Sequence, residues 1–481
     1  MQRSPIILAI LALYAIVASA VQELKVEGSN FVNTVTGDQF QIIGVDYQPG
    51  GSAGFNPGSG VDPLSNGTTC LRDAALMQKL GINTIRVYNL DPTLNHDMCV
   101  SIFNEVGIYM ILDVNTPLPN QSIDSADPSS SYDSVYLEQI FGVVEAFKNY
   151  PNLIGFFSGN EVIDDDTTAG VDPPYVRAVT RDLKNYIAKH STRQIPVGYS
   201  AADVENVLTD TWQYFSCAID GSSTDPSRID FFGLNSYSWC GNATFISSGY
   251  NVLVSDFQDS SVPVFFSEYG CNLVLPRVFS EVQALYSPLM TGVLSGGLVY
   301  EYSQEVSNFG LVIINGNGTV TLRVDYDNLQ AQYNTLNVKT LESSQALSNE
   351  TSKTPTTCSP SLIKNPSFYN NFTLPDVPPG GQDLIDNGIQ NPNNGKIVTV
   401  TTTAVPMAVY AVDGSVISGL AITPLANDQA NAPSGQNLTG SGTTTGSGSA
   451  ASPTKKAAAA NLQVQSVFGL IAGFAIVALF L

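Results

Sequence analysis

The sequence predicts an α/β fold: a (β/α)8 TIM barrel followed by a short post-barrel appendage and a disordered stalk rich in Ser, Thr and Gly. Three observations favour this fold. Strand-like and helix-like segments alternate from Glu23 to Val338. This region covers roughly 310 residues, which suits a TIM barrel with long loops. Two of its apolar segments also end in a glutamate, Glu161 and Glu268.

Eight segments are predicted to form the barrel strands: residues 41–48, 84–90, 109–115, 154–161, 195–200, 231–238, 262–269 and 296–303. Helix candidates between them include residues 70–80, 135–149, 175–190 and 278–285. The alternative fold is an open doubly wound sheet, which requires a glycine-rich phosphate loop after its first strand. Glycines do follow the first strand at residues 50–54, but no clear helix or acidic ribose partner comes after them. We interpret them as a flexible loop.

The two ends of the chain resemble targeting signals. Residues 1–20 contain Arg3, an apolar stretch and the small residues Ala18, Ser19 and Ala20, as a secretory signal peptide does. Residues 454–481 end in an uncharged apolar tail, preceded by a polar spacer and small residues around Ser449. This order predicts a glycosylphosphatidylinositol (GPI) anchor at or near Ser449, with removal of the tail. The alternative is a transmembrane helix, which the missing positive flank disfavours.

The part between these signals divides by composition. Residues 21–358 are the predicted catalytic domain, and residues 359–425 are an appendage or linker with a β-like patch at 396–425. Residues 426–453 are rich in Ser, Thr, Gly and Asn, and are expected to form a disordered stalk that carries the anchor site.

Composition excludes several classes of partner. The net charge of −22, with only 20 Lys and Arg residues, disfavours binding to nucleic acid or to an anionic membrane surface. Only His96 and His190 are present, and both are expected to be exposed because their neighbours in sequence are polar, so no metal and no cofactor is expected. Seven N-glycosylation sequons fit a secreted chain: Asn66, Asn120, Asn242, Asn317, Asn349, Asn371 and Asn437.

The six cysteines are expected to pair in an oxidising compartment. They are Cys70, Cys99, Cys217, Cys240, Cys271 and Cys358. Six cysteines allow fifteen connectivities, which the residues alone leave open.

Glu161 and Glu268 are the central functional candidates. A buried parallel strand is apolar on both faces, so a carboxylate at its end is costly unless it serves a site. The carboxyl ends of barrel strands form the active-site face, and two carboxylates that meet there are the equipment of a glycosidase. Other strand ends supply amides, carboxylates and tyrosines, a mixture that suits sugars: Asp46, Tyr47, Gln48, Tyr88, Asn89, Asp113, Asn115, Asn160, Tyr199, Asp203, Asn235, Tyr237, Tyr300 and Tyr302. Tyr269, or a tyrosine from another strand, is expected to orient Glu268.

Several motifs, in order, resemble glycoside hydrolase family 72. They are Gly44-Val45-Asp46-Tyr47-Gln48-Pro49, Ile85-Arg86-Val87-Tyr88-Asn89, Gly159-Asn160-Glu161-Val162, Phe265-Phe266-Ser267-Glu268-Tyr269-Gly270-Cys271 and Gly296-Gly297-Leu298-Val299-Tyr300-Glu301-Tyr302. These fungal cell-wall β-1,3-glucanosyltransferases are GPI-anchored. The resemblance covers roughly residues 23–358, and this chain resembles the subgroup that lacks a Cys-rich carbohydrate-binding module.

The resemblance implies a role for each matching residue. Glu161 becomes the acid/base and Glu268 the nucleophile of a retaining mechanism. Tyr88, Asn160 and Tyr300 would contact the donor glucan, and Asp203 would lie on the acceptor side. Gln48, Asp113 and Tyr237 are further substrate-binding candidates. The implied disulfides are Cys70–Cys99, Cys217–Cys358 and Cys240–Cys271. A basic residue that some members carry five positions after Asp203 is Leu208 here, which leaves the acceptor preference open.

The sequence therefore predicts a retaining transglycosylase that cleaves β-1,3-glucan and joins the new reducing end to another glucan chain. Its expected partners are the donor and acceptor glucans and, through the GPI anchor, the outer face of the plasma membrane and the cell wall. Two alternatives remain: a β-1,3-glucan hydrolase with the same two glutamates, and a non-catalytic glucan-binding or adhesion protein. A pure binding protein would not need both strand-end carboxylates.

Overall fold

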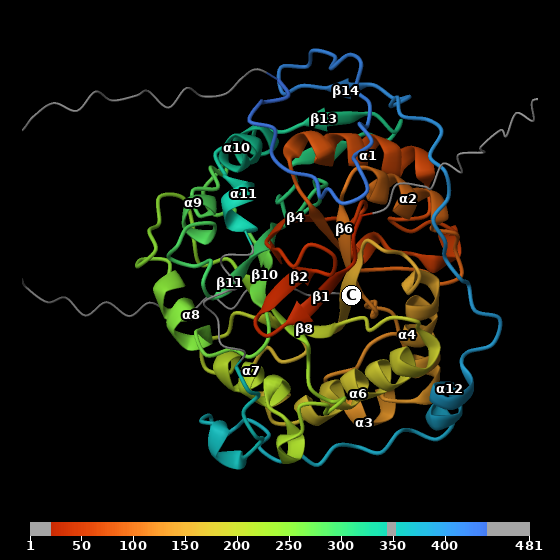
Figure 1. Cartoon of the computed structure of the whole chain (residues 1–481), viewed down its shortest axis with the longest axis vertical. Helices are drawn as coiled ribbons and strands as arrows, with labels where there is room; N and C mark the ends of the chain where they lie inside the picture. The colour runs from red at the N-terminus through yellow and green to blue at the C-terminus, as the bar shows by residue number, and fades with distance from the viewer. Residues whose placement is uncertain (1–20, 344–352, 440–481) are drawn as a thin grey trace, which may run out of the picture.

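The computed structural model describes residues 21–343 and 353–439. Eight parallel strands form a closed barrel in the predicted order, and the last strand pairs with the first through Gly296 and Ile42. Helices surround the strands (Figure 1). The predicted TIM barrel is therefore confirmed. Its strands are β4 (Ile42–Asp46), β5 (Thr84–Val87), β6 (Tyr109–Asp113), β7 (Leu153–Asn160), β8 (Val197–Ala202), β9 (Phe231–Ser236), β10 (Val264–Tyr269) and β11 (Leu294–Val299).

An aromatic plug fills the amino-terminal half of the barrel. Phe157, Phe231 and Phe265 point inward from three strands and are fully buried, with ring centroids 5.3–6.2 Å apart. Phe31 closes the plug from below, 5.8 Å from Phe265. It belongs to the small antiparallel sheet of β1 (Leu24–Glu27), β2 (Asn30–Asn33) and β3 (Gln39–Phe40). Gly198 makes room for this plug, since a Cβ there would lie 2.2 Å from the Phe231 ring.

The outer ring contains one longer or shorter helix for each strand: α1 (Gly67–Leu80), α2 (Asp97–Glu105), α4 (Ser134–Phe147), α6 (Pro173–His190), α7 (Leu208–Ser216), α8 (Tyr250–Phe257), α9 (Val282–Leu285) and α10 (Val324–Tyr333). Shorter pieces are α3 (Pro128–Ser131), α5 (Asp166–Ala169) and α11 (Val338–Leu341). The helix predicted at residues 278–285 is wrong in length. Phe279 has φ of 51°, in the left-handed region, so a right-handed helix cannot pass through it.

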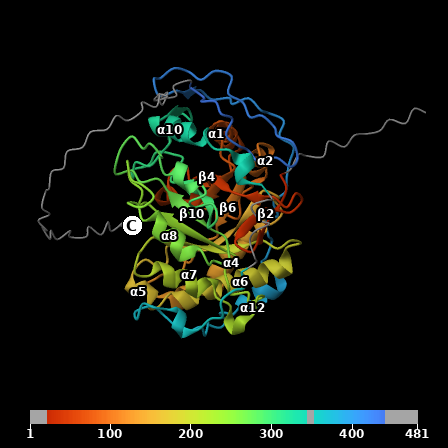
Figure 2. The ribbon, with the colours of Figure 1, turned by 60° about the vertical axis from the view of Figure 1, so that its left-hand side comes forward.

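After Cys358 the chain runs around the outside of the barrel as a strap, which we define as residues 359–439 (Figures 1 and 2). The strap meets the helices in reverse chain order. Asp210 on α7 accepts the backbone N–H groups of Lys364 and Asn365. Further on, α12 (Gly381–Asn387) lies against α6 and α4. Ser101 on α2 then accepts from Val398, and Gln78 on α1 exchanges two hydrogen bonds with Thr423.

Two expectations for the strap change in the structure. The β-like patch at residues 396–425 contains one short strand, β14 (Val409–Tyr410), which pairs with β13 (Val320–Leu322) of the β12 (Val312–Ile314) hairpin. Two isolated antiparallel bridges, Ala404–Ala421 and Tyr410–Val416, are its other β pairing among the described residues. Residues 426–439, which the composition suggested belong to the stalk, lie against the barrel. Asn431 is buried, and its amide donates to the carbonyls of Gln78 and Ile82. Hydrogen bonds between residues so far apart in sequence produce no local sequence pattern, so the composition of residues 426–439 could not predict this packing.

His96 also differs from expectation. It is buried, only 1% exposed, and its Nε2 lies 2.7 Å from a carboxylate oxygen of Asp62. Polar neighbours in sequence suggested exposure, but the loop carrying Asp62 folds over the ring.

The targeting signals are outside the described residues. Residues 1–20, Asn349, Ser449 and the apolar tail are among those not described. Within residues 21–343 and 353–439, no helix combines the length and apolarity needed to cross a membrane.

Three disulfides fasten the barrel: Cys70–Cys99, Cys217–Cys358 and Cys240–Cys271, the pairing that the family resemblance implies. The second connects α7 to the start of the strap and spans 141 residues, whereas the third spans 31. In the chain-entropy model a disulfide stabilises by restricting the unfolded chain, and more so for a longer loop.

We therefore expect the double variant Cys217→Ala/Cys358→Ala to lose about 4–5 kcal/mol of unfolding free energy. The matched pair Cys240→Ala/Cys271→Ala should lose about 3–4 kcal/mol. Denaturant titration of both variants measures the difference. A smaller loss for the 141-residue loop would contradict the entropic account.

Candidate active site

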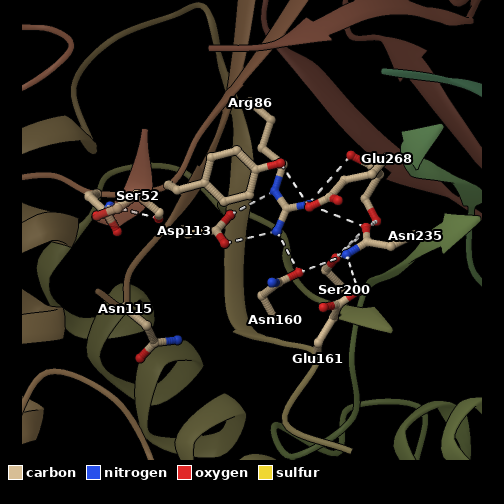
Figure 3. Close-up of polar contacts among 12 residues, drawn as sticks. Ser52, Arg86, Asp113, Asn115, Asn160, Glu161, Ser200, Asn235 and Glu268 are labelled. Carbon is tan, nitrogen blue, oxygen red and sulfur yellow. Dashed lines mark hydrogen bonds and ion pairs between the residues drawn. The ribbon is translucent and has the colours of Figure 1, made fainter. Parts of the chain in front are cut away.

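The two glutamates meet at the carboxyl end of the barrel (Figure 3). Glu268 is the penultimate residue of β10, and Glu161 is the first residue after β7. The backbone of Glu161 has φ of 51°, a conformation that costs energy for any residue with a Cβ. Its N–H donates to the Ser200 carbonyl of the next strand at 2.8 Å, which fixes this turn. The strain re-aims the side chain from the strand toward the barrel mouth.

Arg86 is the centre of the site. It lies in the middle of β5, is fully buried and points into the barrel. Its guanidinium makes a bidentate pair with Asp113, with N–O distances of 3.0 and 2.9 Å. The remaining N–H groups reach the Asn160 amide oxygen at 2.9 Å and Glu268 Oε1 at 3.2 Å. The guanidinium carbon also lies 4.6 Å from the Phe157 ring centroid, so the aromatic plug supports it from below.

Asn235 connects the two glutamates through this network. Its Oδ1 accepts hydrogen bonds from Ser267 at 2.8 Å and Ser200 at 3.1 Å. Arg86 Nη1 also lies 3.5 Å from this oxygen, and because a guanidinium can only donate, that contact fixes which way the amide faces. Its Nδ2 then donates to Glu161 Oε1 at 2.9 Å and to the Asn160 amide oxygen at 3.1 Å. Glu161 is thereby oriented by a side chain from β9.

Glu268 is buried and receives three donors. Tyr88 donates to Oε1 at 2.8 Å, beside Arg86, and Tyr237 donates to Oε2 at 2.6 Å. Burial is the largest influence and raises the pKa of Glu268. Arg86 opposes this, the charge of Glu161 raises the pKa further, and hydrogen bonds from Tyr237 and Tyr88 lower it. All three donors favour the ionised carboxylate.

The neighbouring tyrosine Tyr269 does not orient Glu268. Its hydroxyl is paired with that of Tyr333 at 3.0 Å, on the outer side of the strand. Adjacent residues of a strand face opposite ways, so Tyr269 points away when Glu268 points in. Tyr88 and Tyr237, which follow other strands, orient Glu268 instead. A tyrosine from another strand is the alternative to Tyr269 that the sequence predicts.

Glu161 differs from Glu268 in exposure. Its side chain is open to solvent, while Glu268 is 8% exposed. Glu161 also borders a groove of about 340 Å³ that runs past Tyr88, Asp113 and Asn160 toward Asn115. The Glu268 carboxylate is therefore buried and held by hydrogen bonds. The Glu161 carboxylate lies where the hydroxyl of a leaving or entering molecule can reach it.

Asp46, at the end of β4, is a further carboxyl group beneath the site. It is fully buried, and neither carboxyl oxygen has a hydrogen-bond partner among the described residues. Burial raises its pKa well above the usual value, and the charge of Glu268 adds to this while Arg86 opposes it. Burial therefore favours the neutral form of Asp46, which is not a hydrogen-bond partner of Arg86, whereas Asp113 and Glu268 are.

Comparison with known proteins decides the family. A model for glycoside hydrolase family 72, described as "Glucanosyltransferase", matches residues 13–337. The chain belongs to this family. The 1,3-beta-glucanosyltransferase gel2 of Aspergillus fumigatus is 56% identical over 419 residues, which make up 87% of this chain and 86% of that protein. The 1,3-beta-glucanosyltransferase GAS4 of Saccharomyces cerevisiae is 46% identical over 342 residues, 70% of this chain and 72% of that one.

A solved structure from the same group of proteins is also similar to this chain. A variant of Gas2 from Saccharomyces cerevisiae, in complex with laminaritetraose and laminaripentaose, matches with 36% identity and a TM-score of 0.63. The match covers 74% of this chain and 75% of the Gas2 chain.

Other residues singled out in the sequence have the following positions. Gln48 is buried, and its side-chain oxygen accepts the N–H groups of Tyr88 and Asn89. Tyr300 follows β11, with its ring centroid 6.4 Å from Tyr88 and 6.3 Å from Tyr237. Asp203 is exposed after β8 and accepts from Ser236 at 2.7 Å. Leu208 is buried in the core at the start of α7, so it presents no side chain to the cleft.

Some strand-end candidates are not at the site. Tyr47 and Tyr302 both donate to Asp73 on α1, outside the barrel. Tyr199 accepts the N–H of Ile163 and so supports the loop after Glu161.

Asp113 and Asn160 do lie at the site, beside Glu161. Asp113 accepts hydrogen bonds from Arg86 with both carboxylate oxygens. Asn160 gives its amide oxygen to Arg86 and Asn235, which directs its amino group to the groove.

Arg86 is the functional residue that sequence reasoning missed. A signal existed, since an arginine within a buried parallel strand needs charged partners. Nothing in residues 85–87 shows that those partners are Asp113 and Glu268. Within the described part of the chain, no group of three or more His, Cys, Asp or Glu side chains could hold a metal ion.

The Tyr237 hydrogen bond makes a testable contribution. Because it favours ionised Glu268, its loss in Tyr237→Phe should raise the pKa of that carboxyl. The acid limb of the kcat/KM profile should then move to higher pH, by about one unit if the bond to the charged group is worth about 1.5 kcal/mol. Tyr269→Phe, which loses a hydroxyl that pairs with Tyr333 and not with Glu268, is the control and should not move the limb. An unmoved limb in Tyr237→Phe would contradict the proposed contact.

Proposed function

We propose that this protein cleaves β-1,3-glucan and transfers the new reducing end to the non-reducing end of another β-1,3-glucan chain, with retention at the anomeric carbon. The observation that carries this proposal is the unequal pair of glutamates. Glu268 is buried and fixed by three donors, while Glu161 is exposed at the groove and fixed by one. A retaining enzyme needs one carboxylate as nucleophile and one as proton carrier.

In the first step the Glu268 carboxylate attacks the anomeric carbon, and the bond from that carbon to the glycosidic oxygen breaks. Glu161 gives its proton to the leaving oxygen, so the released chain leaves as an alcohol. The product is a glycosyl ester on Glu268. Arg86, Tyr88 and Tyr237 direct the attacking oxygen and share the charge that returns when the ester later breaks.

In the second step the ionised Glu161 removes the proton from a hydroxyl of the acceptor glucan. That oxygen attacks the anomeric carbon, and the ester bond to Glu268 breaks. Tyr88, Asn160 and Tyr300 would contact the donor, and Gln48, Asp113 and Tyr237 are further substrate-binding candidates. Asp203 would lie on the acceptor side. Transfer exceeds hydrolysis when an acceptor fills the cleft before water attacks.

The test is an incubation with a laminari-oligosaccharide labelled at its reducing end. Products longer than the substrate are expected. Products that are only shorter would mean hydrolysis with the same two glutamates, and no product at all would favour a glucan-binding or adhesion role.

We also propose that the mature protein is secreted to the cell surface and bound to the outer plasma membrane by a GPI anchor near Ser449. Small residues, a spacer and an uncharged apolar tail support this order of processing. Truncation before Ser449 should release active enzyme to the medium, and phosphatidylinositol-specific phospholipase C should release the anchored form if its inositol is not acylated. A surface protein that still ends in Leu481 would refute the anchor.

A further inference from the structure

A second groove, which shares no lining residue with the groove beside Glu161, contains a glycosylation sequon. Its volume is about 550 Å³, and it lies between the loop after β6, helix α4 and the strap. Asn120 lines it, and Asn120-Gln121-Ser122 is a sequon. A cavity of this size lies within the range of small-ligand pockets. The question is what fills it.

The backbone presents Asn120 at the tip of a tight turn. The Gln121 N–H donates to the Leu118 carbonyl at 3.1 Å, Pro119 occupies the second position, and Asn120 has φ of 61°. Proline followed by a residue with positive φ defines a type II turn. Asn120 is exposed, so an enzyme that attaches sugar can reach it. Asparagine tolerates this conformation, but glycine would adopt it with less strain.

The groove matches the two-sided chemistry of an N-acetylglucosamine. Its floor is one stripe of α4, in which Val135, Glu138, Gln139 and Gly142 follow helical spacing. Val135 is 57% exposed, an apolar side chain with nothing over it. Apolar groups can contact the sugar C–H face and the N-acetyl methyl, while amides bind hydroxyls.

The strap forms the opposite wall. Gln390 and Asn391 present amide side chains, and Ile389 adds an apolar one. Asn393 fastens this segment to the loop after β5 through the Pro92 and Leu94 carbonyls. None of the described residues that line the groove is aromatic. A free glucan chain would be expected to stack on aromatic rings, so a covalently attached sugar fits better.

We propose that Asn120 carries an N-glycan whose first sugars occupy this groove and connect the barrel to residues 389–393 of the strap. This rests on the proposed secretory route, which the three disulfides also favour. The glycan then covers Val135 and ties the strap to α4.

The first test uses the full chain, secreted from a fungal host. Glycopeptide mass spectrometry should find Asn120 modified. Endoglycosidase H, which cleaves between the two core N-acetylglucosamines, should act on the native protein at exposed Asn242 but not at Asn120. Denatured protein should be cleaved at both. Val135→Asp keeps the sequon and changes only an exposed side chain, and should make the Asn120 glycan cleavable in the native state.

The second test measures the strap. Asn120→Gly suits the turn and removes the glycan, so the turn should survive. Hydrogen exchange of residues 388–393 should be roughly tenfold faster, the change expected when one or two hydrogen bonds are lost. Asn242→Gln, which removes a sugar outside the groove, should leave this exchange unchanged.

Three results would overturn the proposal. Asn120 unmodified while Asn242 is modified would leave secretion intact and reject the site. A modified Asn120 that is cleaved as fast as Asn242 in the native protein would place its glycan outside the groove. Protection of the groove by added laminari-oligosaccharide, with Asn120 unmodified, would make it a glucan site. If no sequon is modified, the secretory route itself fails.

Discussion

Replacing Glu268 with glutamine is expected to abolish glucan elongation, because the amide cannot form the glycosyl ester. Glu161→Gln should reduce turnover of laminari-oligosaccharides by about 10²–10⁴-fold, the usual contribution of a general acid. Both side chains lie at strand ends above the core, so both variants should fold. Product length and initial rate measure the effect.

The two variants separate when the leaving group is activated. A donor with an acidic phenol needs no protonation, so Glu161→Gln should still form its glycosyl-enzyme. Azide, which needs no deprotonation, should then speed the breakdown of that intermediate. Neither the activated donor nor azide should restore activity to Glu268→Gln. Near-normal elongation by Glu161→Gln would refute its role as acid and base.

Replacing Arg86 with methionine is expected to damage stability and activity together. Asp113 and Glu268 would lose their buried cation, and breaking a buried pair on one side costs about 3–5 kcal/mol. Burial already raises the pKa of Asp113, with Arg86 acting against it, so the variant should raise that pKa further. A carboxyl whose pKa is higher in the folded than in the unfolded protein favours folding when protonated. The loss should therefore be largest near pH 7 and shrink as the pH falls through the raised pKa values.

Arg72→Met is the matched control. Arg72 is equally buried and pairs with Asp73 on α1, away from the glutamates. The Arg72→Met variant should have a lower free energy of unfolding, while the turnover per folded molecule stays unchanged. If Arg86→Met retained turnover per folded molecule, Arg86 would be a structural residue only.

The barrel could be predicted because its signal is local. Each strand is a short apolar segment, and all eight predicted segments overlap the observed strands. The position of the glutamates followed from topology, since parallel strands bring their carboxyl ends to one face. The site network could not be predicted in the same way. Arg86, Asn235 and Glu268 are far apart in sequence, and their contacts depend on strand register.

The strap and the tyrosines show the same limit. Asn431 of the strap binds the Ile82 carbonyl, and Asp210 on α7 binds Lys364 of the strap, both over long sequence separations. Composition does not show such contacts, and it assigned residues 426–439 to a stalk. Tyr269 stood next to Glu268 in sequence, yet pleating turns it outward and leaves the work to Tyr88 and Tyr237. The Phe279 conformation that ends the predicted helix at residues 278–285 depends on packing too.

The most direct test asks which carboxylate becomes covalently attached to the sugar. A 2-fluoro-substituted laminaribiosyl fluoride, given to the unmodified enzyme, should trap the glycosyl-enzyme because the fluorine slows both steps and the fluoride leaves without an acid. Peptide mass spectrometry should then find one disaccharide, on Glu268. Label on Glu161 would reverse the assigned roles. No label on either glutamate, with the substrate still turned over, would contradict the covalent mechanism.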